Sequence, residues 1–216
     1  MMIIHHLGVT NSIANQYLAE LRDPMRQSNR FLFRRNLTRL GTIMAYEISK
    51  ELSYQERAIT TPLGKKNMNI PASDVVLLTV LRAGLPFLEG FQHVFDQADT
   101  GFVGAFRVEG AAELRIQAGY VAVPRLEGKQ VVLIDTMLAT GRSLADAIAG
   151  ITAQGQPSHI HMANVIAAPE GIRYLEENTK VPLTLWTFAI DDRLNSDYYI
   201  VPGLGDAGDL SYGSKT

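Results

Sequence analysis

Cysteine is absent from this sequence of 216 residues. Its absence excludes disulfide bridges, thiolate metal sites and cysteine nucleophiles. Charge is also sparse, because charged residues make up 19% of the chain, and 20 Lys and Arg against 22 Asp and Glu give a formal net charge of −2. Proteins that bind nucleic acid generally carry a basic surplus, so the composition predicts no nucleic-acid partner.

Long hydrophobic runs are absent as well. The longest apolar run, at residues 75–81, is far shorter than the about 20 residues that span a bilayer, so we expect no membrane partner. The N-terminal MMIIHHLGVTNS has neither the basic nor the apolar region of a signal peptide, which favours a cytoplasmic protein. No linker, repeat or low-complexity segment divides the chain, and this predicts one domain over residues 1–216.

The first quarter of the chain has the apolar spacing of helices. Intervals of three and four residues, which predict one buried helical face, separate Leu37, Leu40, Met44 and Ile48. A second helix is predicted near residues 12–22, with Ser12 as its N-cap. A group of basic residues is interpreted as a solvated or oligomer-facing surface: Arg26, Arg30, Arg34 and Arg35.

After residue 73 the pattern changes to short, almost continuous apolar runs. Such runs are typical of strands buried on both faces of a parallel sheet, and they occupy residues 75–81, 131–134, 159–168 and 183–190. Helix-like segments lie between several of them, at residues 86–95, 143–154 and 170–177. This alternation predicts an α/β fold with a doubly wound, mostly parallel sheet flanked by helices.

Two stretches do not fit the alternation and are predicted to form hairpin arms. They cover residues 57–70 and 101–123. Their turn signals lie at residues 64–67 and near Gly110.

The strongest chemical signal follows the apolar run at residues 131–134. In VVLIDTMLATGRSLADAI, Asp135 ends a predicted strand, and Thr140, Gly141 and Ser143 begin a predicted helix. Free backbone N–H groups at a helix N-terminus favour phosphate, and Asp135 can accept bonds from ribose hydroxyls. Ligands of such sheets bind at the carboxyl ends of the strands. The loop therefore predicts a sugar-phosphate site, with an ordinary strand–loop–helix connection as the alternative.

This loop resembles the signature by which type I phosphoribosyltransferases bind phosphoribosyl pyrophosphate (PRPP): four apolar residues, an acidic residue, and a TGxS or TGxT end. DTMLATGRS is most similar to the DPMLATGGS of uracil phosphoribosyltransferases and departs from it at Thr136 and Arg142. The side chain of Arg142 is expected to point outward. The resemblance implies that PRPP contacts Asp135, Thr136, Met137, Leu138, Ala139, Thr140, Gly141, Arg142 and Ser143.

Three further segments are similar to the same family. LRAGLPFLEG (residues 81–90) resembles its pyrophosphate loop, AAPEGI (167–172) is shared with it, and YIVPGLGDAGD (199–209) resembles its uracil-recognition segment. A weaker match, LRD…FR…LG…AYE, lies in the N-terminal quarter. The resemblance implies that Arg82 and Arg107 bind the phosphates of PRPP and that a cis peptide bond lies beside Arg82. Residues 108–117 are expected either to cover the pyrophosphate or to form a solvated loop, which Glu109, Glu113 and Arg115 fit equally well.

The C-terminal segment carries the expected base specificity. By resemblance, uracil contacts main-chain atoms of Ile200, Gly205, Asp206 and Ala207, and Asp206 also contacts PRPP. Arg82 and Asp206 are the expected catalytic residues. Arg82 neutralises the leaving pyrophosphate, and Asp206 either orients metal-bound waters or takes the N1 proton of uracil. Mg²⁺ is the expected cofactor, held mainly through PRPP and water rather than by protein ligands.

The expected reaction converts uracil and PRPP to UMP and pyrophosphate. One alternative is a transferase for another base, against which the PGLGDAGD segment argues. Another is a transferase-like protein that senses PRPP or nucleotides and regulates RNA, which the arginines Arg82 and Arg107 and the absence of a basic surplus disfavour. Family habit implies a homodimer or a higher even oligomer, with the arm at residues 57–70 packed on a partner subunit.

Two histidines at the N-terminus, His5 and His6, lack the companion ligands of a metal site and are expected at the surface. Two others, His159 and His161, alternate along a predicted strand and are expected on one of its faces. A pair of carboxylates at the end of the last predicted strand is expected near the base pocket, without direct contact to the base: Asp191 and Asp192.

Overall fold

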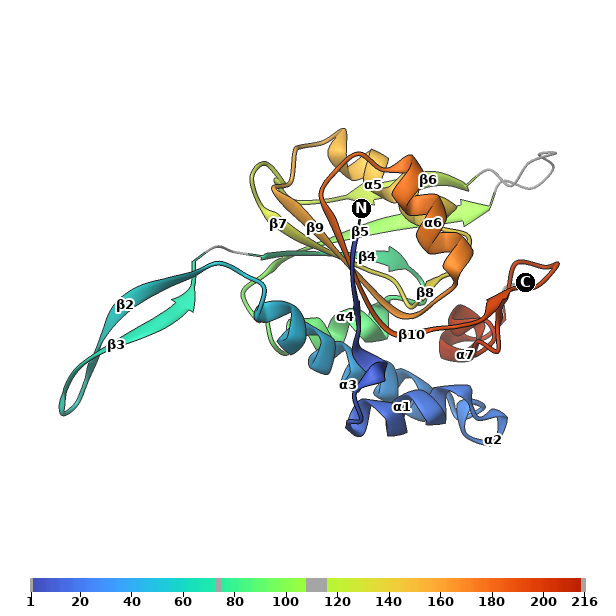
Figure 1. The fold of residues 1–216 in the computed structure, drawn as a ribbon, viewed down its shortest axis with the longest axis horizontal. Coiled ribbons are helices and arrows are strands. Elements are labelled where there is room, and N and C mark those ends of the chain that lie inside the picture. Colours follow the sequence, from blue (N-terminus) through green and yellow to red (C-terminus); the bar gives the residue numbers. More distant parts are fainter. Residues whose placement is uncertain (1, 73–74, 108–115, 215–216) are drawn as a thin grey trace.

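The computed structural model describes residues 2–72, 75–107 and 116–214. Within these residues the central sheet contains eight strands, namely β1 (Ile3–His6), β4 (Val75–Leu81), β5 (Asp99–Arg107), β6 (Ile116–Ala122), β7 (Gln130–Ile134), β8 (Met137–Leu138), β9 (His159–Ala167) and β10 (Leu183–Ile190). The order is β1-β10-β9-β7-β4-β5-β6, with β8 beside β9 (Figure 1). All neighbours are parallel except β5 and β6.

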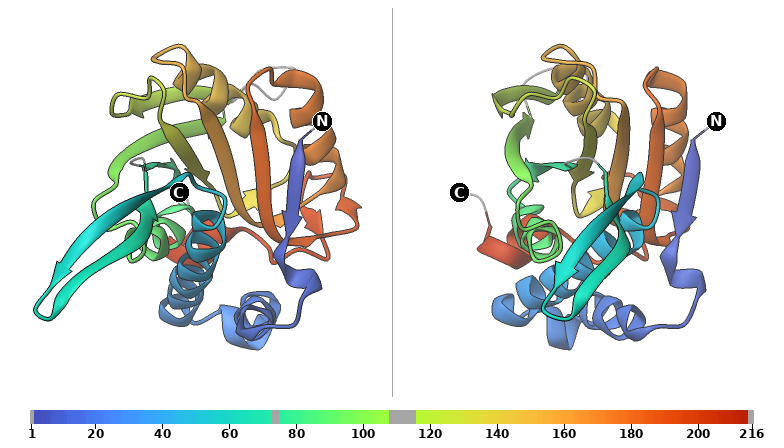
Figure 2. Two further views of the ribbon diagram at one scale, coloured as in Figure 1. Left: turned by 60° about the vertical axis from the view of Figure 1, so that its left-hand side comes forward. Right: turned by 90° about the vertical axis from the view of Figure 1, so that its left-hand side faces the viewer.

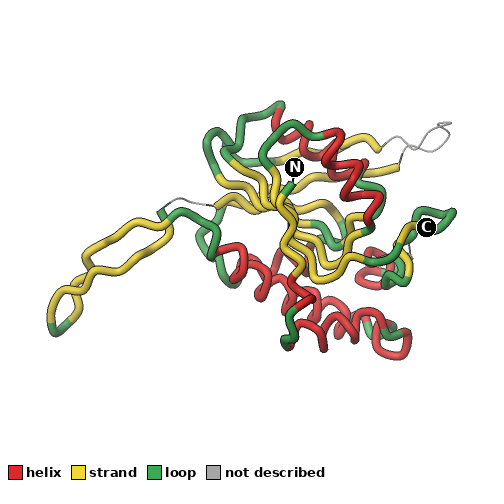
Figure 3. The backbone as a smooth tube through the Cα atoms, in the orientation of Figure 1, coloured by secondary structure: helices red, strands yellow, loops and turns green. Residues whose placement is uncertain are grey.

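Helices cover both faces of this sheet (Figures 1 and 3). One face packs against α1 (Ile13–Arg22), α3 (Arg30–Ser49) and α4 (Leu85–Gln92), and the other against α5 (Arg142–Thr152) and α6 (Pro169–Asn178). The short helices η1 (Leu7–Val9) and α2 (Pro24–Gln27) flank α1. The expected doubly wound α/β architecture is thus confirmed, because each apolar strand run is buried between two helical layers.

The predicted N-terminal helices are confirmed in detail. The four apolar residues that define the expected stripe are fully buried in α3: Leu37, Leu40, Met44 and Ile48. Ser12 caps α1, since its Oγ accepts a hydrogen bond of 3.2 Å from the backbone N–H of Ala14. This bond satisfies one of the free N–H groups at the start of the helix.

The N-terminal strand β1 was not predicted. It pairs in parallel with β10 at one edge of the sheet (Figure 2). His5 stacks on Trp186 of β10, with ring centroids 3.9 Å apart and planes 6° apart. The expectation that His5 and His6 lie at the surface is therefore met only in part. Both are half-buried strand residues, because strand pairing overrides the weak apolar pattern of MMIIHH.

The predicted arm is an antiparallel hairpin of β2 (Tyr54–Thr61) and β3 (Gly64–Pro71) that projects from the body on the side opposite the C-terminal helix (Figure 1). Its turn lies at Pro62 and Leu63, so the predicted turn at residues 64–67 is wrong. The hydroxyl of Thr61 accepts bonds from the N–H groups of Leu63 and Gly64, which closes the turn before the lysines. The side chain of Leu63 is fully exposed.

The second predicted hairpin is formed by β5 and β6, with a register shift between Gly104 and Ala105. Its expected turn near Gly110 lies outside the described residues. After β10 the chain forms the small ribbon of β11 (Arg193–Leu194) and β12 (Ile200–Val201), then α7 (Ala207–Tyr212). No helix in the described part of the chain is long and apolar enough to cross a membrane.

Candidate active site

Asp135 stands directly after β7, where the main chain is held from two sides. Its N–H donates to the carbonyl of Ala163 at 3.0 Å, and its carbonyl accepts from Nδ2 of Asn164 at 3.0 Å. Its Oδ1 accepts a bond of 2.7 Å from the N–H of Thr136. Burial raises the pKa of the Asp135 carboxyl to about 7, although the N–H groups of Thr136 and Met137 act in the opposite direction.

Thr136 occupies the first position at which this loop departs from the pattern that it resembles. The residue is 1% exposed, and its carbonyl accepts from the N–H of Val165 at 2.9 Å. Its Oγ1 is buried and has no hydrogen-bond partner within the described residues. Because the side chain is enclosed, any contact of Thr136 with a ligand must be made by its main chain.

The middle of the loop is built into the sheet. Met137 and Leu138 form β8 and pair with β9, and the carbonyl of Leu138 accepts from the N–H of Ala168 at 2.8 Å. The side chain of Leu138 is fully buried in the core, and Ala139 packs against the core on the other face. This part of the loop therefore fixes the position of the polar residues that follow it.

Gly141 caps α5 in the left-handed conformation, with φ of +78°. A Cβ atom here would lie 2.6 Å from the carbonyl oxygen of Gly171, so only glycine permits this approach of the loop to α6. Thr140 accepts a bond of 3.4 Å from the N–H of Arg142, and Ser143 is half-buried in the first turn. The start of α5 thus offers the backbone N–H groups and hydroxyls that favour phosphate.

Arg142, the second departure, points away from this loop. Its guanidinium lies over the ring of Tyr174 in α6, 5.6 Å from the ring centroid, and the residue is exposed. The expectation that its side chain points outward is confirmed.

Arg82 follows β4 across a cis peptide bond from Leu81, as the resemblance implied. Its Nη2 lies 3.4 Å from Oδ1 of Asp209 in α7 and 3.4 Å from the carbonyl of Gly213. Its Nε is buried without a hydrogen-bond partner among the described residues. The structure thus brings the loop after β4 against the C-terminal helix, although the two are far apart in sequence.

Arg107 ends β5, where its backbone pairs with Ile116. The side chain that would reach a phosphate lies outside the described part of the chain. Most of the expected cover, residues 108–115, also lies outside it.

The C-terminal segment turns sharply between β12 and α7. The bond from Val201 to Pro202 is cis, and Gly203 and Gly205 have φ of +61° and +90°. Asp206 caps α7, since its Oδ1 accepts from the N–H of Asp209 at 2.9 Å. The predicted base-contacting residues divide into two exposed ones, Gly205 and Asp206, and two buried ones, Ile200 and Ala207.

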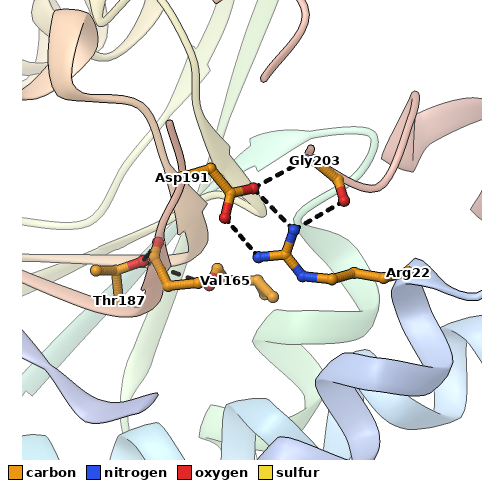
Figure 4. A network of polar contacts seen from close by, with 6 residues as sticks. Arg22, Val165, Thr187, Asp191 and Gly203 are labelled. Atoms are coloured by element: carbon orange, nitrogen blue, oxygen red, sulfur yellow. Dashed lines mark hydrogen bonds and ion pairs between the residues drawn. The ribbon is translucent and has the colours of Figure 1, made fainter. Parts of the chain in front are cut away.

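An ion pair that the sequence did not predict holds this segment (Figure 4). Arg22 of α1 donates from Nη1 and Nη2 to the carboxylate of Asp191 at 2.8 and 2.7 Å. Nη1 of Arg22 also donates to the carbonyl of Gly203 at 2.9 Å, and the N–H of Gly203 donates to Asp191 at 2.9 Å. Asp191 and Asp192 therefore both lie close to the segment as expected. The N–H of Asp192 donates to the carbonyl of Val201 at 3.0 Å, although its side chain is exposed.

Arg34 contacts the last residues of α7, the helix in which the C-terminal segment ends. Its Nη1 donates to the carbonyl of Ser211 at 2.7 Å, and its guanidinium lies 5.9 Å from the ring centroid of Tyr212. The expectation of a solvated or oligomer-facing side chain is wrong for Arg34, which is half-buried, whereas Arg26, Arg30 and Arg35 are exposed. The weak match LRD…FR contains both Arg22 and Arg34, and this was the signal that could have identified them.

Comparison with known proteins gives a consistent result. The family model described as uracil phosphoribosyltransferase matches residues 9–214. A uracil phosphoribosyltransferase of Porphyromonas gingivalis is 43% identical over 215 residues, which covers 99% of this chain and 100% of the relative. One of Thermococcus kodakarensis is 39% identical over 202 residues, covering 92% and 86%.

Solved structures share the fold of this chain. The AQ2163 protein of Aquifex aeolicus has a TM-score of 0.86 and 34% identity, with 98% of each chain covered. A hypoxanthine phosphoribosyltransferase of Staphylococcus aureus has a TM-score of 0.51 at 11% identity, covering 73% of this chain and 74% of that one, a likeness that concerns the fold alone. The family match extends over the loop after β7, the loop after β4 and the C-terminal segment, so the chain belongs to the uracil phosphoribosyltransferase family.

Proposed function

We propose that this protein transfers the 5-phosphoribosyl group of PRPP to uracil, giving UMP and pyrophosphate in pyrimidine salvage. The observation that carries the proposal is the family match over residues 9–214, which includes every segment of the candidate site. The contact of Arg82 with Asp209 supports it, because it brings the expected pyrophosphate loop against the expected base-recognition segment.

PRPP is assigned to the carboxyl ends of β4, β5 and β7. Asp135 accepts bonds from the ribose hydroxyls, and the turn at Thr140, Gly141 and Ser143 binds the 5-phosphate at the start of α5. Arg82 and Arg107 bind the diphosphate, because guanidinium groups can donate two parallel bonds to phosphate oxygens.

Uracil is assigned to the main chain of Ile200, Gly205, Asp206 and Ala207. In the reaction, the bond between C1 of the ribose and the pyrophosphate oxygen breaks, and the bond from N1 of uracil to C1 forms. The pyrophosphate leaves with the electron pair of the broken bond, and the N1 proton passes to Asp206 directly or through water. The enzyme accelerates this exchange mainly by aligning the two substrates and stabilising the charge on the leaving group.

Mg²⁺ belongs to the same proposal. Among the described residues, no group of three or more His, Asp or Glu side chains is arranged to hold a metal ion. Asp135 and Asp206 are the carboxylates of the proposed site, and an ion there would be held mainly by PRPP and water, since Mg²⁺ readily keeps its waters. When bound, Mg²⁺ would supply positive charge against the diphosphate.

Assembly and location complete the proposal. The arm of β2 and β3 is exposed along most of its length, and an isolated two-stranded hairpin has little stability of its own. We therefore assign the arm to an interface in a homodimer or a higher even oligomer. The enzyme is assigned to the cytoplasm. Sedimentation at micromolar concentration should show a species heavier than the 23.8 kDa chain, and a single species of that mass would contradict this assembly.

The proposed activity is tested by measuring pyrophosphate release from PRPP with a panel of bases. Uracil should support release together with formation of UMP, and hypoxanthine, guanine, adenine and cytosine should not. Efficient use of a purine base would contradict the assignment of substrate. If no base supported the release of pyrophosphate from PRPP in the presence of Mg²⁺, the assignment of activity would be contradicted.

A further inference from the structure

Arg22 and Asp191 together hold one residue of the C-terminal segment by both of its backbone polar groups. Arg22 donates to the carbonyl of Gly203 at 2.9 Å, and Asp191 accepts from its N–H at 2.9 Å (Figure 4). We infer that Arg22 is a positioning residue for uracil. Through this clamp, defined as Arg22, Asp191 and Gly203, it sets where the base-recognition backbone lies. The inference rests on the proposed recognition of uracil by residues 200–207.

The geometry of the clamp is well suited to this task. The two guanidinium–carboxylate bonds, of 2.7 and 2.8 Å, are parallel and charge-assisted, and such pairs fix direction as well as distance. The side chain of Asp191 is only 6% exposed and that of Arg22 is 24% exposed, so solvent competes little with the pair. Nη1 of Arg22 bonds both to Asp191 and to Gly203, which ties the ion pair to the main chain.

Both partners of the clamp are themselves fixed in the fold. Asp191 follows β10, and its N–H donates to the carbonyl of Ala167 at 2.9 Å. Arg22 ends α1, where the side-chain amide of Gln27 donates to the carbonyls of Leu21 and Arg22 at 3.1 Å. The clamp therefore fixes Gly203 relative to the sheet and to the N-terminal helices, although Gly203 lies 181 residues after Arg22 in the chain.

Gly203 is the point at which such a restraint matters most. It lies between Ile200 and Gly205, two of the residues assigned to uracil, and its φ of +61° marks the bend between them. A Cβ atom at Gly203 would lie 2.1 Å from the carbonyl oxygen of Ile200, so the bend is tight. Recognition by main-chain groups depends on placement within a fraction of an ångström, and Gly205 itself is exposed. A shift at Gly203 would therefore misplace the groups that contact the base.

The test compares Arg22→Met, Arg22→Lys and the double variant Arg22→Met/Asp191→Asn in steady-state kinetics and thermal unfolding. Arg22→Met should raise the KM for uracil about tenfold or more and change the KM for PRPP by less than about twofold. Arg22→Lys should fall between wild type and Arg22→Met, because an ammonium group cannot donate two parallel bonds.

The double variant separates positioning from stability. Arg22→Met leaves the buried carboxylate of Asp191 unpaired, which lowers Tm, and Asp191→Asn removes that charge. We expect the double variant to regain much of the lost Tm and to keep the raised KM for uracil. If it regained wild-type uracil kinetics along with its Tm, or if Arg22→Met raised both KM values equally, Arg22 would be a structural residue only and the inference would be overturned.

Arg39→Met is the matched control. Arg39 lies on α3, donates to Oδ1 of Asn36 at 2.9 Å and lies over the ring of Tyr17 in α1. Its loss should lower Tm without changing the KM for uracil, and an equal rise in that KM would overturn the inference by showing that any loss of helix packing has this effect.

A tail variant distinguishes failure of the clamp from failure of the proposed recognition. Gly205→Val alters the C-terminal segment directly and should abolish use of uracil. If Gly205→Val does so and Arg22→Met has normal uracil kinetics, the clamp alone is overturned. If Gly205→Val has normal uracil kinetics, recognition of uracil by this segment is overturned, and the role of the clamp with it.

Discussion

The indole N–H of Trp186 donates a hydrogen bond of 3.2 Å to Nδ1 of His161. Because Nδ1 accepts, the neutral ring carries its proton on Nε2, which lies 3.0 Å from Oε1 of Gln130. His159 lies on the same strand face, as predicted, with its ring centroid 4.6 Å away. Burial, together with the neighbouring His159 and His5, lowers the pKa of His161 to about 4.

This arrangement predicts that folding stability decreases as the pH is lowered. The pKa of histidine in an unfolded chain is about 6.5, and the folded-state value is lower, so the unfolded chain binds the proton first. The contribution of His161 is therefore complete above about pH 6.5 and decreases as pH falls toward 4, by about 3 kcal/mol in the free energy of unfolding. Denaturant titrations followed by the fluorescence of Trp186, the single tryptophan, measure this loss.

A pair of variants isolates the contribution. His161→Gln keeps an acceptor and a donor but cannot titrate, so it should flatten the dependence between pH 7 and pH 4. His93 is exposed, and His93→Gln should retain the wild-type slope. Equal slopes for wild type and His161→Gln would show that other groups cause the dependence.

Asp135 predicts that the use of PRPP also depends on pH. Its carboxyl has a pKa raised to about 7 by burial, and the ionised form is the stronger acceptor for ribose hydroxyls. The value of kcat/KM for PRPP, which reports on the free enzyme, should therefore rise about tenfold from pH 6 to pH 8. Asp135→Asn should lower kcat/KM by about tenfold to a hundredfold or more at pH 8.

The quantity to measure is the kcat/KM for PRPP of wild type divided by that of Asp135→Asn, because ionisation of PRPP itself affects both proteins equally. That ratio should increase with pH and level off above about pH 8. The folded state binds a proton at Asp135 more tightly than the unfolded state, so this group destabilises the fold as pH rises from about 4 through 7. Asp135→Asn should consequently unfold at a higher temperature than wild type at pH 8. A ratio of about one at every pH would remove Asp135 from the site, and a larger ratio that did not change with pH would contradict the titration of its carboxyl near pH 7.

How far the sequence alone predicts this molecule depends on the range of the interactions involved. The strand at residues 131–134 and the helix starting after Gly141 are predictable because an apolar run and a glycine turn act within a few residues. The contact of Arg22 with Gly203 is not predictable from the sequence, because the two residues are distant in the chain. By local pattern alone, Arg22 could have been a solvated residue and Gly203 an ordinary turn residue. The strand at Ile3–His6 was missed for the same reason, since its pairing with β10 and the stacking of His5 on Trp186 are tertiary contacts.

Gly141 is predicted to tolerate no side chain. Its φ of +78° disfavours other residues by about 1–2 kcal/mol, and a Cβ atom would lie 2.6 Å from the carbonyl oxygen of Gly171. Gly141→Ala should therefore lower Tm and reduce kcat/KM for PRPP by about tenfold or more, because the start of α5 shifts. Gly150→Ala is the control within the same helix, where a Cβ atom meets nothing within 4 Å. It should raise stability by about 0.5–1 kcal/mol and leave the kinetics unchanged, and a similar loss in both variants would contradict the proposed fit.

The last prediction concerns the choice between uracil and cytosine. Uracil presents acceptor, donor and acceptor groups along one edge, a pattern that backbone C=O and N–H groups can match without side chains. The bend at residues 202–205 supplies such groups, because Pro202 restrains φ while Gly203 and Gly205 adopt φ of +61° and +90°. Cytosine replaces the 4-oxo acceptor with an amino donor and lacks the N3 proton, so two groups of the site would face like partners.

Each unmatched buried group costs about 1–3 kcal/mol, and sites that bind their substrate by hydrogen bonds can reject a mismatched analogue by factors of up to about 10⁴–10⁵. We therefore expect kcat/KM for cytosine to be lower than that for uracil by several orders of magnitude, and 5-fluorouracil to be accepted, because fluorine changes none of these groups. Ile200→Val keeps the main chain and should preserve this ranking, whereas Gly205→Val forces a β-branched residue into a φ of +90° and should abolish activity. Use of cytosine as efficiently as uracil would show that the C-terminal backbone does not select the base.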